Sequence, residues 1–356
     1  MDISVTPPIF NEIRRTFVIN GKDNILAKKM TTSKLSELIN AADMNKTNDG
    51  KDFVIGHGGY DDKVVVLGTI EFLRKLCSTD AIYMSGFKIQ LQTKAFKYLY
   101  TFHCFIGEKI ITTVYALLTK NDTKSYSRML RLINSTANRN NFKLNPTKFY
   151  IDVDLNIIHS IEGTFGRRGI AIKLSLYHYT NTIWYKAKCL GLLQNNDFNI
   201  QKTIRRMCLL ALVPVEQIED TWIIIKEEAP QNENLLELVS YVTETFMISN
   251  VGHKFDKKVW NHYDTNNVKS INHLEGWNDF IEKDINKSYL SNKNFVAKLK
   301  NKHQSFEMTF VTNQEKSNEI SMIPKKFKFI EGKFKRAKQR LENGIISAIQ
   351  YLDEMV

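Results

Sequence analysis

Two aspartates in one short segment are the first residues of this sequence that could do chemistry. Asp152 and Asp154 alternate along FYIDVDLN, directly behind the apolar run from Phe149 to Ile151. A carboxylate at the end of a buried strand is costly unless it ligates a metal or caps the next helix. Asp152 is therefore a candidate metal ligand. Asp154 is either a second ligand or the cap of a helix over residues 155–165.

A third carboxylate, Glu275, lies in the segment HLEGWNDFIEKDI. Apolar residues recur there at helical spacing, at Leu274, Trp277, Ile281 and Ile285. The spacing predicts an amphipathic helix with Glu275 beside its apolar stripe. Because a lone glutamate on a helix is normally solvated, its significance depends on the elements that surround it.

The order of predicted elements supplies that context. From residue 64 the chain is rich in β-formers, with the segments KVVVLG, DAIYMSGFKI, KYLYTFHCFIG and KIITTVYALLT spaced as hairpins. A helix over 124–138, the strand KFYIDVDL, a helix over 155–165, the strand GIAIKLSLYH and a helix over 180–193 follow. Further helices are predicted over about 195–247, in NKNFVAKLKNKHQ and around 339–355.

This order predicts an α/β fold with an RNase H-like mixed sheet flanked by helices and an all-helical insertion. We expect an N-terminal appendage over residues 1–63, a core over 64–300 with the insertion at about 195–255, and a basic C-terminal tail over 301–356. In such a core, carboxylates converge on two divalent ions, which activate an attacking oxygen and neutralise a leaving one.

Five segments resemble the transposases of Mutator-like elements (MULE) between about residues 64 and 300. VYALLTKNDTKSYSRMLRLI is similar to the family block "vyaLl…tY…l", and YLYTFHCFIGEKI to "QLYTIHG". FYIDVDLNIIHSIEGTF resembles "imtDFEkAiinAi…F", LYHYTNTIWYKAKCLGL resembles "C.FH..qal.rki..lGL", and SINHLEGWNDFIEKDI resembles "TNNaVEGWHnrLn". The blocks keep the family's order and spacing.

The resemblance implies roles for particular residues. The second catalytic aspartate corresponds to Asp152, and the third catalytic carboxylate to Glu275. Asp154 stands where the family has a glutamate and is a further candidate ligand, so the implied metal set for Mg²⁺ or Mn²⁺ is Asp152, Glu275 and Asp154. His178 matches the histidine of the C-x-x-H block, whose cysteine is replaced by Ser175.

The first catalytic aspartate of the family has no counterpart. In IYMSGFKI its place is taken by Ser85, or by Met84 in the alternative register, and neither ligates Mg²⁺ as a carboxylate does. Asp80 lies four or five residues away, roughly 13–16 Å along a strand. Two-metal catalysis is therefore expected to be impaired.

The charge distribution points to a polyanionic partner. The chain carries a net charge of +12. The segment KKFKFIEGKFKRAKQR holds eight basic residues and only Glu331 as an acidic one. Basic surfaces attract nucleic acid by counterion release, and the interleaved phenylalanines could stack on bases. The predicted DNA-binding residues are Lys325, Lys326, Lys328, Lys333, Lys335, Arg336, Lys338 and Arg340.

Three hypotheses remain open at the level of sequence. The chain is a degenerate MULE-like protein that keeps its fold and DNA binding, an active transposase or nuclease with a rebuilt metal site, or a non-enzymatic module whose basic segment is a nuclear-import signal. All three predict a nuclear protein, or a cytoplasmic one in a cell without a nucleus. We expect DNA as partner, no membrane and no small-molecule substrate, and homo-oligomerisation is left open.

Other classes are disfavoured by composition. No stretch of about 18 apolar residues indicates a membrane span, and the N-terminus lacks the order of a secretory signal. The cysteines Cys77, Cys104, Cys189 and Cys208 have no C-x-x-C spacing, so neither a disulfide framework nor a zinc site is indicated. With 43% hydrophobic and 25% charged residues, the chain is expected to be globular.

Overall fold

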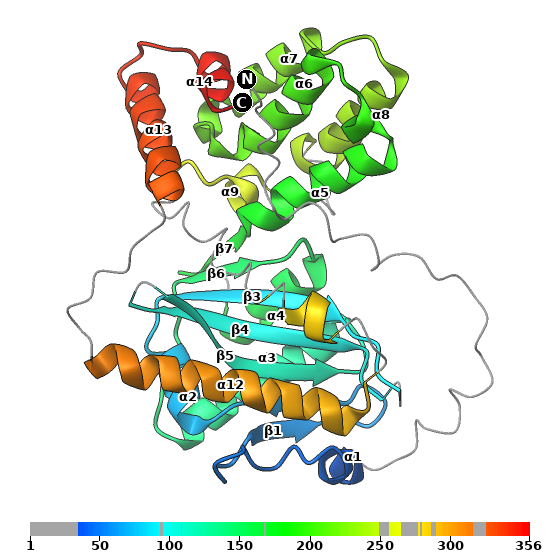
Figure 1. The fold of residues 1–356 in the computed structure, drawn as a ribbon, viewed down its shortest axis with the longest axis vertical. Coiled ribbons are helices and arrows are strands. Elements are labelled where there is room, and N and C mark those ends of the chain that lie inside the picture. The colour runs from blue at the N-terminus through cyan, green and yellow to red at the C-terminus, as the bar shows by residue number, and fades with distance from the viewer. Residues whose placement is uncertain are drawn as a thin grey trace. The chain divides into compact units, whose positions relative to one another are not determined.

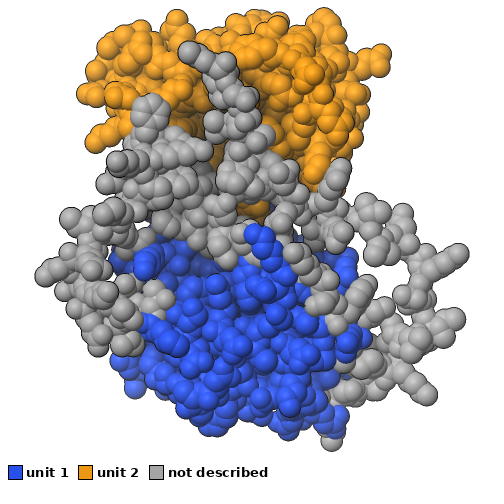
Figure 2. All heavy atoms as spheres, in the orientation of Figure 1, with its two compact units in different colours: residues 1–170, 272–319 blue, residues 171–271, 320–356 orange. Residues whose placement is uncertain are grey.

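The computed structural model describes residues 35–92, 95–107, 109–166, 169–248, 256–264, 277, 280–285, 290–315 and 325–356. Side chains are described for these residues apart from 282, 309–315 and 325–331. The chain divides into two compact units, coloured separately in Figure 2. Unit 1 comprises residues 1–170 and 272–319, and unit 2 comprises residues 171–271 and 320–356.

The strands form a seven-stranded mixed sheet in the order β1-β2-β5-β4-β3-β6-β7 (Figure 1). The strands β3, β4 and β5 make an antiparallel meander, and β3 pairs in parallel with β6. Gly107, with a φ of 62°, supplies the left-handed residue of the β4–β5 turn. The predicted α/β, RNase H-like fold is confirmed. The strands are β1 (Val54–Gly58), β2 (Val64–Leu67), β3 (Ala81–Lys88), β4 (Tyr98–Ile106), β5 (Lys109–Leu118), β6 (Lys148–Ile151) and β7 (Ala171–Leu174).

Helices cover both faces of the sheet in unit 1. On one face lie α2 (Ile70–Cys77) and α12 (Asn292–Glu315), where His303 of α12 contacts the rings of Phe72 and Tyr115. On the other face lie α3 (Thr123–Arg139) and α4 (Leu155–Phe165), which pack on each other. The short α1 (Leu35–Ala41) precedes β1. We call these the α12 face and the α3 face.

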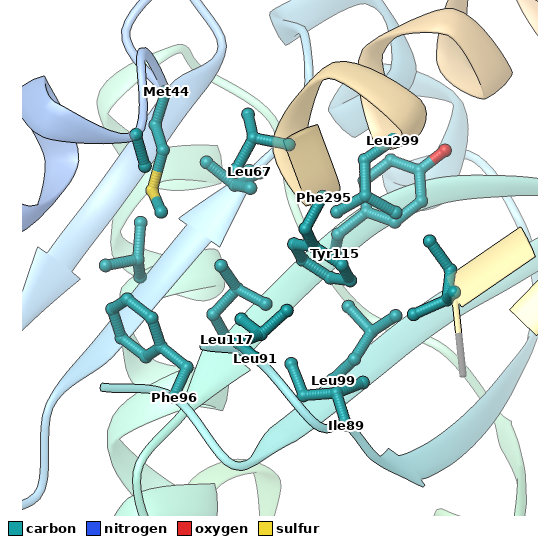
Figure 3. Close-up of a cluster of buried hydrophobic side chains, with 14 of the residues drawn as sticks. Met44, Leu67, Ile89, Leu91, Phe96, Leu99, Tyr115, Leu117, Phe295 and Leu299 are labelled. Atoms are coloured by element: carbon teal, nitrogen blue, oxygen red, sulfur yellow. The ribbon is translucent and has the colours of Figure 1, made fainter. Parts of the chain in front are cut away.

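A large cluster of buried hydrophobic residues in unit 1 lies on the α12 face, as Figure 3 shows. Leu67, Tyr115, Leu117 and Leu99 alternate with residues of the opposite face along β2, β5 and β4, and they point towards the apolar side of α12. Phe295 and Leu299 of that helix are fully buried, as is Met44, which follows α1. The apolar residues of the strands and of α12 thus form one continuous core.

Unit 2 is helical apart from β7. The predicted insertion is all-helical where it is described, from residue 198 to 247. Arg206 is buried in this unit, and its guanidinium donates hydrogen bonds of 2.6 and 2.7 Å to Asp353 and of 2.5 Å to Glu228. The helices are α5 (Leu176–Cys189), α6 (Phe198–Leu209), α7 (Ile218–Glu227), α8 (Glu233–Val242), α9 (Lys257–Trp260), α13 (Lys325–Glu342) and α14 (Ala348–Met355). Single turns lie at Leu192–Gln194, Leu210–Leu212, Val215–Gln217 and Thr243–Met247, and a further π turn at Ile281–Ile285 belongs to unit 1.

Several elements differ from the prediction. β1 lies inside the range expected to be an appendage, yet it pairs with β2 and extends the sheet. The helix α2 was not predicted, although Phe72, Leu73 and Leu76 form its buried face. The single helix expected around 339–355 is two helices, because Gly344 adopts a φ of 67° and Ser347 caps α14 with a capping box.

Candidate functional site

The candidate site lies where β6 ends beside β3. β6 ends at Ile151, and its last pair with β3 is Tyr83 with Tyr150. Oδ2 of Asp152 accepts a hydrogen bond of 2.7 Å from the backbone N–H of Gly86. The carboxylate therefore continues the hydrogen bonding of β3 beyond the end of the neighbouring strand, where a backbone donor would otherwise lack a partner from β6.

Asp154 performs the capping role that the sequence left as one of two alternatives. Its Oδ1 accepts a hydrogen bond of 2.9 Å from the backbone N–H of Asn156 at the start of α4. Its Oδ2 accepts a second bond of 2.9 Å from the hydroxyl of Tyr126 on α3. Both oxygens are thus engaged by protein donors, and Asp154 ties the N-terminus of α4 to α3.

Two tyrosines connect this carboxylate to the sheet. The hydroxyls of Tyr100 on β4 and Tyr126 are hydrogen bonded, and their rings meet edge to face with centroids 4.8 Å apart. Because Tyr126 donates its proton to Asp154, Tyr100 is the donor to Tyr126. Burial raises the pKa of both phenols, and the negative charges of Asp152 and Asp154 raise the pKa of Tyr100 further. Both phenols stay protonated.

Tyr100 lies directly over Gly86. The two residues are partners in the antiparallel pairing of β3 with β4, so they share the α3 face of the sheet. A Cβ atom on Gly86 would lie only 2.5 Å from Cζ of Tyr100 and 2.8 Å from its hydroxyl oxygen. The tyrosine ring therefore fills the space that a side chain at position 86 would use.

The structure shows which face of the sheet each candidate for the place of the first aspartate occupies. Ser85 pairs with Thr101 and lies on the α12 face, and its backbone carbonyl accepts a hydrogen bond of 3.3 Å from the Thr101 hydroxyl. Met84 and Gly86, by contrast, share the face of Tyr100, because side chains alternate along a strand. The residue of β3 that contacts Asp152 is Gly86, through its backbone N–H, and Ser85 is buried on the α12 face.

The described residues do not fit the pair of divalent ions that the resemblance implies. Glu275 lies outside the described residues, so its predicted convergence with Asp152 stays a prediction. Within the described part of the chain, no three His, Cys, Asp or Glu side chains form a group that could hold a metal ion. Asp152 and Asp154 accept hydrogen bonds from Gly86, Asn156 and Tyr126 instead.

The two histidines of the family-like blocks belong to different units. His103 is buried in unit 1 between the hydroxyls of Thr101 and Thr112, at 2.7 and 2.9 Å, and burial lowers its pKa to about 3. His178 is on α5 in unit 2, where its ring meets that of Tyr177 edge to face. His103 is therefore a neutral structural residue.

The five predicted DNA-binding residues whose side chains are described divide into two groups on α13. Lys333, Lys335 and Arg336 are exposed. Lys338 donates a hydrogen bond of 2.7 Å to the carbonyl of Tyr263 and lies over its ring, and Arg340 pairs with Glu354. The remaining three, Lys325, Lys326 and Lys328, belong to the helix, but their side chains lie outside the description.

Three residues of this site escaped the sequence analysis: Gly86, Tyr100 and Tyr126. Tyr126 falls within the helix predicted over 124–138, where it was not recognised as a site residue. Alternation along DAIYMSGFKI could have placed Met84 and Gly86 on one face. The pairing of Gly86 with Tyr100 depends on the register of β3 and β4, for which the residues between the two strands give no signal.

Comparison with known proteins identifies no family for this chain. No protein-family model matches this chain, and no curated protein matches it. In the part of the chain that is described, no helix is both long enough and apolar enough to span a membrane.

Proposed function

We propose that this chain is a DNA-binding protein of the MULE-transposase type whose metal-dependent strand transfer is impaired. Three features support the proposal: the RNase H-like strand order, the family-like blocks, and a basic helix in unit 2. The impairment rests on β3, where the residue that contacts Asp152 is a glycine. In a cell with a nucleus, we expect the protein to act there.

The observation that carries DNA binding is the exposed basic surface of α13. Ala337 and Leu341 are buried and hold the helix in unit 2, whereas Lys333, Lys335 and Arg336 face solvent. None of these three belongs to the ion pairs found among the described residues. Unpaired exposed cations are available to phosphates, and their binding releases condensed counterions.

The test is a salt titration of binding to a labelled DNA duplex, measured by fluorescence anisotropy. We expect the affinity to fall steeply with salt. Replacing Lys333, Lys335 and Arg336 by glutamine should weaken binding and lower the salt slope by about 1 for each phosphate that is no longer neutralised. Substitution is preferable to truncation, because removing α13 and α14 would take away Tyr351 and Leu352, which are buried in unit 2.

A charge-matched control distinguishes the effect of removing basic residues from α13 from the effect of lowering the net charge of the protein. Lys120, Lys143 and Lys148 are exposed residues of unit 1, and replacing them by glutamine removes the same three charges. We expect this variant to bind with nearly the native salt slope. Equal losses of affinity in both triple variants would contradict a DNA surface on α13, and salt-independent binding would contradict the electrostatic basis of the proposal.

A further inference from the structure

The disagreement between the residues around Asp152 and a divalent-cation site has a specific structural cause. Three neighbouring residues, Gly86, Tyr100 and Asp152, make contacts with one another that leave no room for a side chain at position 86. Position 86 has no side chain, the space above it holds the ring of Tyr100, and Asp152 accepts the N–H of Gly86. We propose that Tyr100 closes this site to divalent cations, and that Asp152 and Asp154 serve as structural acceptors.

Steric exclusion is the first part of the proposal. A carboxylate at position 86 could reach a cation beside Asp152 only if the Tyr100 ring moved away, since even a Cβ atom would lie within 3 Å of three ring and hydroxyl atoms. The ring is held by its hydroxyl bond to Tyr126 and is 7% exposed. Its removal is therefore a precondition for a side chain on this face.

Hydrogen bonding is the second part. A cation at Asp154, or at Oδ2 of Asp152, would compete for oxygens that already accept N–H and O–H donors from Gly86, Asn156 and Tyr126. Those donors are fixed by β3, α4 and α3. Displacing them would leave partly buried polar groups unsatisfied. The chain Tyr100–Tyr126–Asp154 occupies the α3 face with neutral donors, where a metal site would need further anionic oxygens.

The proposal predicts different thermal stabilities for Asp152→Asn and Asp152→Ala. Asparagine keeps an oxygen that can accept the Gly86 N–H, so Asp152→Asn should melt close to the native protein. Asp152→Ala leaves this N–H without its acceptor and should lower the Tm by roughly 3–6 °C. A metal-ligand role predicts a different pattern, in which Asp152→Asn loses cation binding as fully as Asp152→Ala.

The experiment titrates Mn²⁺ into the full chain, with electron paramagnetic resonance to count bound ions and thermal melts with and without Mg²⁺. We expect the native protein and Asp152→Asn to give the same Mn²⁺ binding and the same Mg²⁺ response. A bound Mn²⁺ in the native protein that Asp152→Asn removes would overturn the proposal. So would a Tm loss in Asp152→Asn as large as that in Asp152→Ala.

A gain-of-site variant tests the role of Tyr100. We expect Gly86→Asp with Tyr100→Ala to acquire a bound Mn²⁺ that neither single variant has. The matched control is Gly163→Asp with Tyr100→Ala, because Gly163 lies on α4 with open space around it and adds the same charge. A folded Gly86→Asp/Tyr100→Ala protein without a new ion would refute closure by Tyr100.

If the double variant does not fold, the comparison of Mn²⁺ binding by the native protein and by Asp152→Asn still tests the proposal. That comparison involves no substitution at position 86 or 100. No measurement in this series contains DNA. Failure of this inference is therefore distinguishable from failure of the proposed DNA binding.

Discussion

At the scale of single residues, Asp154 shows how a carboxylate that follows a strand caps a helix and bonds to a second one. Its two oxygens accept from Asn156 and Tyr126, so it closes the first turn of α4 and joins that helix to α3. An N-cap of this kind contributes about 1 kcal/mol to stability, and the tyrosine bond adds to it.

We therefore predict that Asp154→Ala lowers the free energy of unfolding by about 1–3 kcal/mol. Asp154→Asn should cost much less, because asparagine is a good N-cap and its oxygen can still accept a hydrogen bond. Urea unfolding followed by circular dichroism measures both values. Equal losses of stability in the two variants would show that the charge of Asp154, and not its hydrogen bonding, matters.

Buried histidines make the stability of unit 1 depend on pH. His303 lies among Phe53, Phe72 and Tyr115, and burial lowers its pKa to about 4, with Lys51 acting in the same direction and Asp49 opposing. Unfolded histidine has a pKa of about 6.5. Between those two values the unfolded chain binds a proton that the folded chain does not.

The predicted consequence is a loss of stability on acidification. The free energy of unfolding should be highest above about pH 6.5 and should fall towards pH 4 by up to about 1.4 kcal/mol per pH unit for each such histidine. His303→Gln should reduce this slope, whatever it does to stability at neutral pH. Urea titrations at several pH values measure the slope. An unchanged slope in His303→Gln would mean that this side chain is not neutral and buried.

At the scale of elements, the pairing of β3 with β4 depends on a glycine opposite a tyrosine. Gly86 and Tyr100 are cross-strand partners, and the ring takes up the space above the glycine. Packing of this kind couples the two positions energetically, because each residue sets the room available to the other.

A double-mutant cycle tests this coupling. Gly86→Ala should cost about 1–3 kcal/mol in the native background, since the added methyl overlaps the ring and forces the strands apart. In the Tyr100→Ala background the same change should cost little or nothing, because alanine leaves the space free. The measurement is the free energy of unfolding of the four proteins. Additive effects would contradict the close approach of the ring to position 86.

Two elements differ from the sequence-based prediction for local reasons: β1, and the break between α13 and α14. β1 is short and contains Gly56 and Gly58, so it lacks the apolar alternation that marks a strand, and its pairing with β2 stabilises it. The break between α13 and α14 is signalled locally by Gly344 and by the Ser347 and Gln350 capping box. The helical spacing of apolar residues continues across this break, and the sequence therefore predicted one helix instead of two.

At the scale of the whole molecule, the proposed loss of catalysis leads to a direct prediction. With Mg²⁺ or Mn²⁺ present, we expect the native protein to leave supercoiled plasmid DNA intact while it binds a labelled duplex. The physical reason is that two-metal chemistry needs several converging carboxylates, and the residue of β3 beside Asp152 has no side chain. Gel electrophoresis of nicked and supercoiled forms is the readout.

Glu275→Gln is the informative companion variant, because the family resemblance assigns a metal ligand to that position. We expect it to match the native protein in this assay. Cleavage by the native protein that disappears in Glu275→Gln would mean an active nuclease with a rebuilt site, and it would contradict the proposed impairment.

Much of the fold and part of the site could be predicted from the sequence. Strand and helix periodicities are local, so the order of elements and the RNase H-like class could be derived without the tertiary structure. The cap formed by Asp154 was one of two alternatives, because an aspartate ahead of an apolar-periodic run is a local signal. The concentration of basic residues in 325–340 is also a property of the sequence alone.

The arrangement around Asp152 depends on the tertiary structure. A shift of one residue in strand pairing moves every side chain to the opposite face, so the sequence could not decide which residue of IYMSGFKI lies beside Asp152. In the structure the backbone N–H of Gly86 bonds to Asp152, and the register places the Ser85 side chain on the α12 face. The contact of Tyr100 with Gly86 and its bond to Tyr126 join β4 to β3 and α3. Such contacts between distant segments exist only after the sheet and its helices have packed.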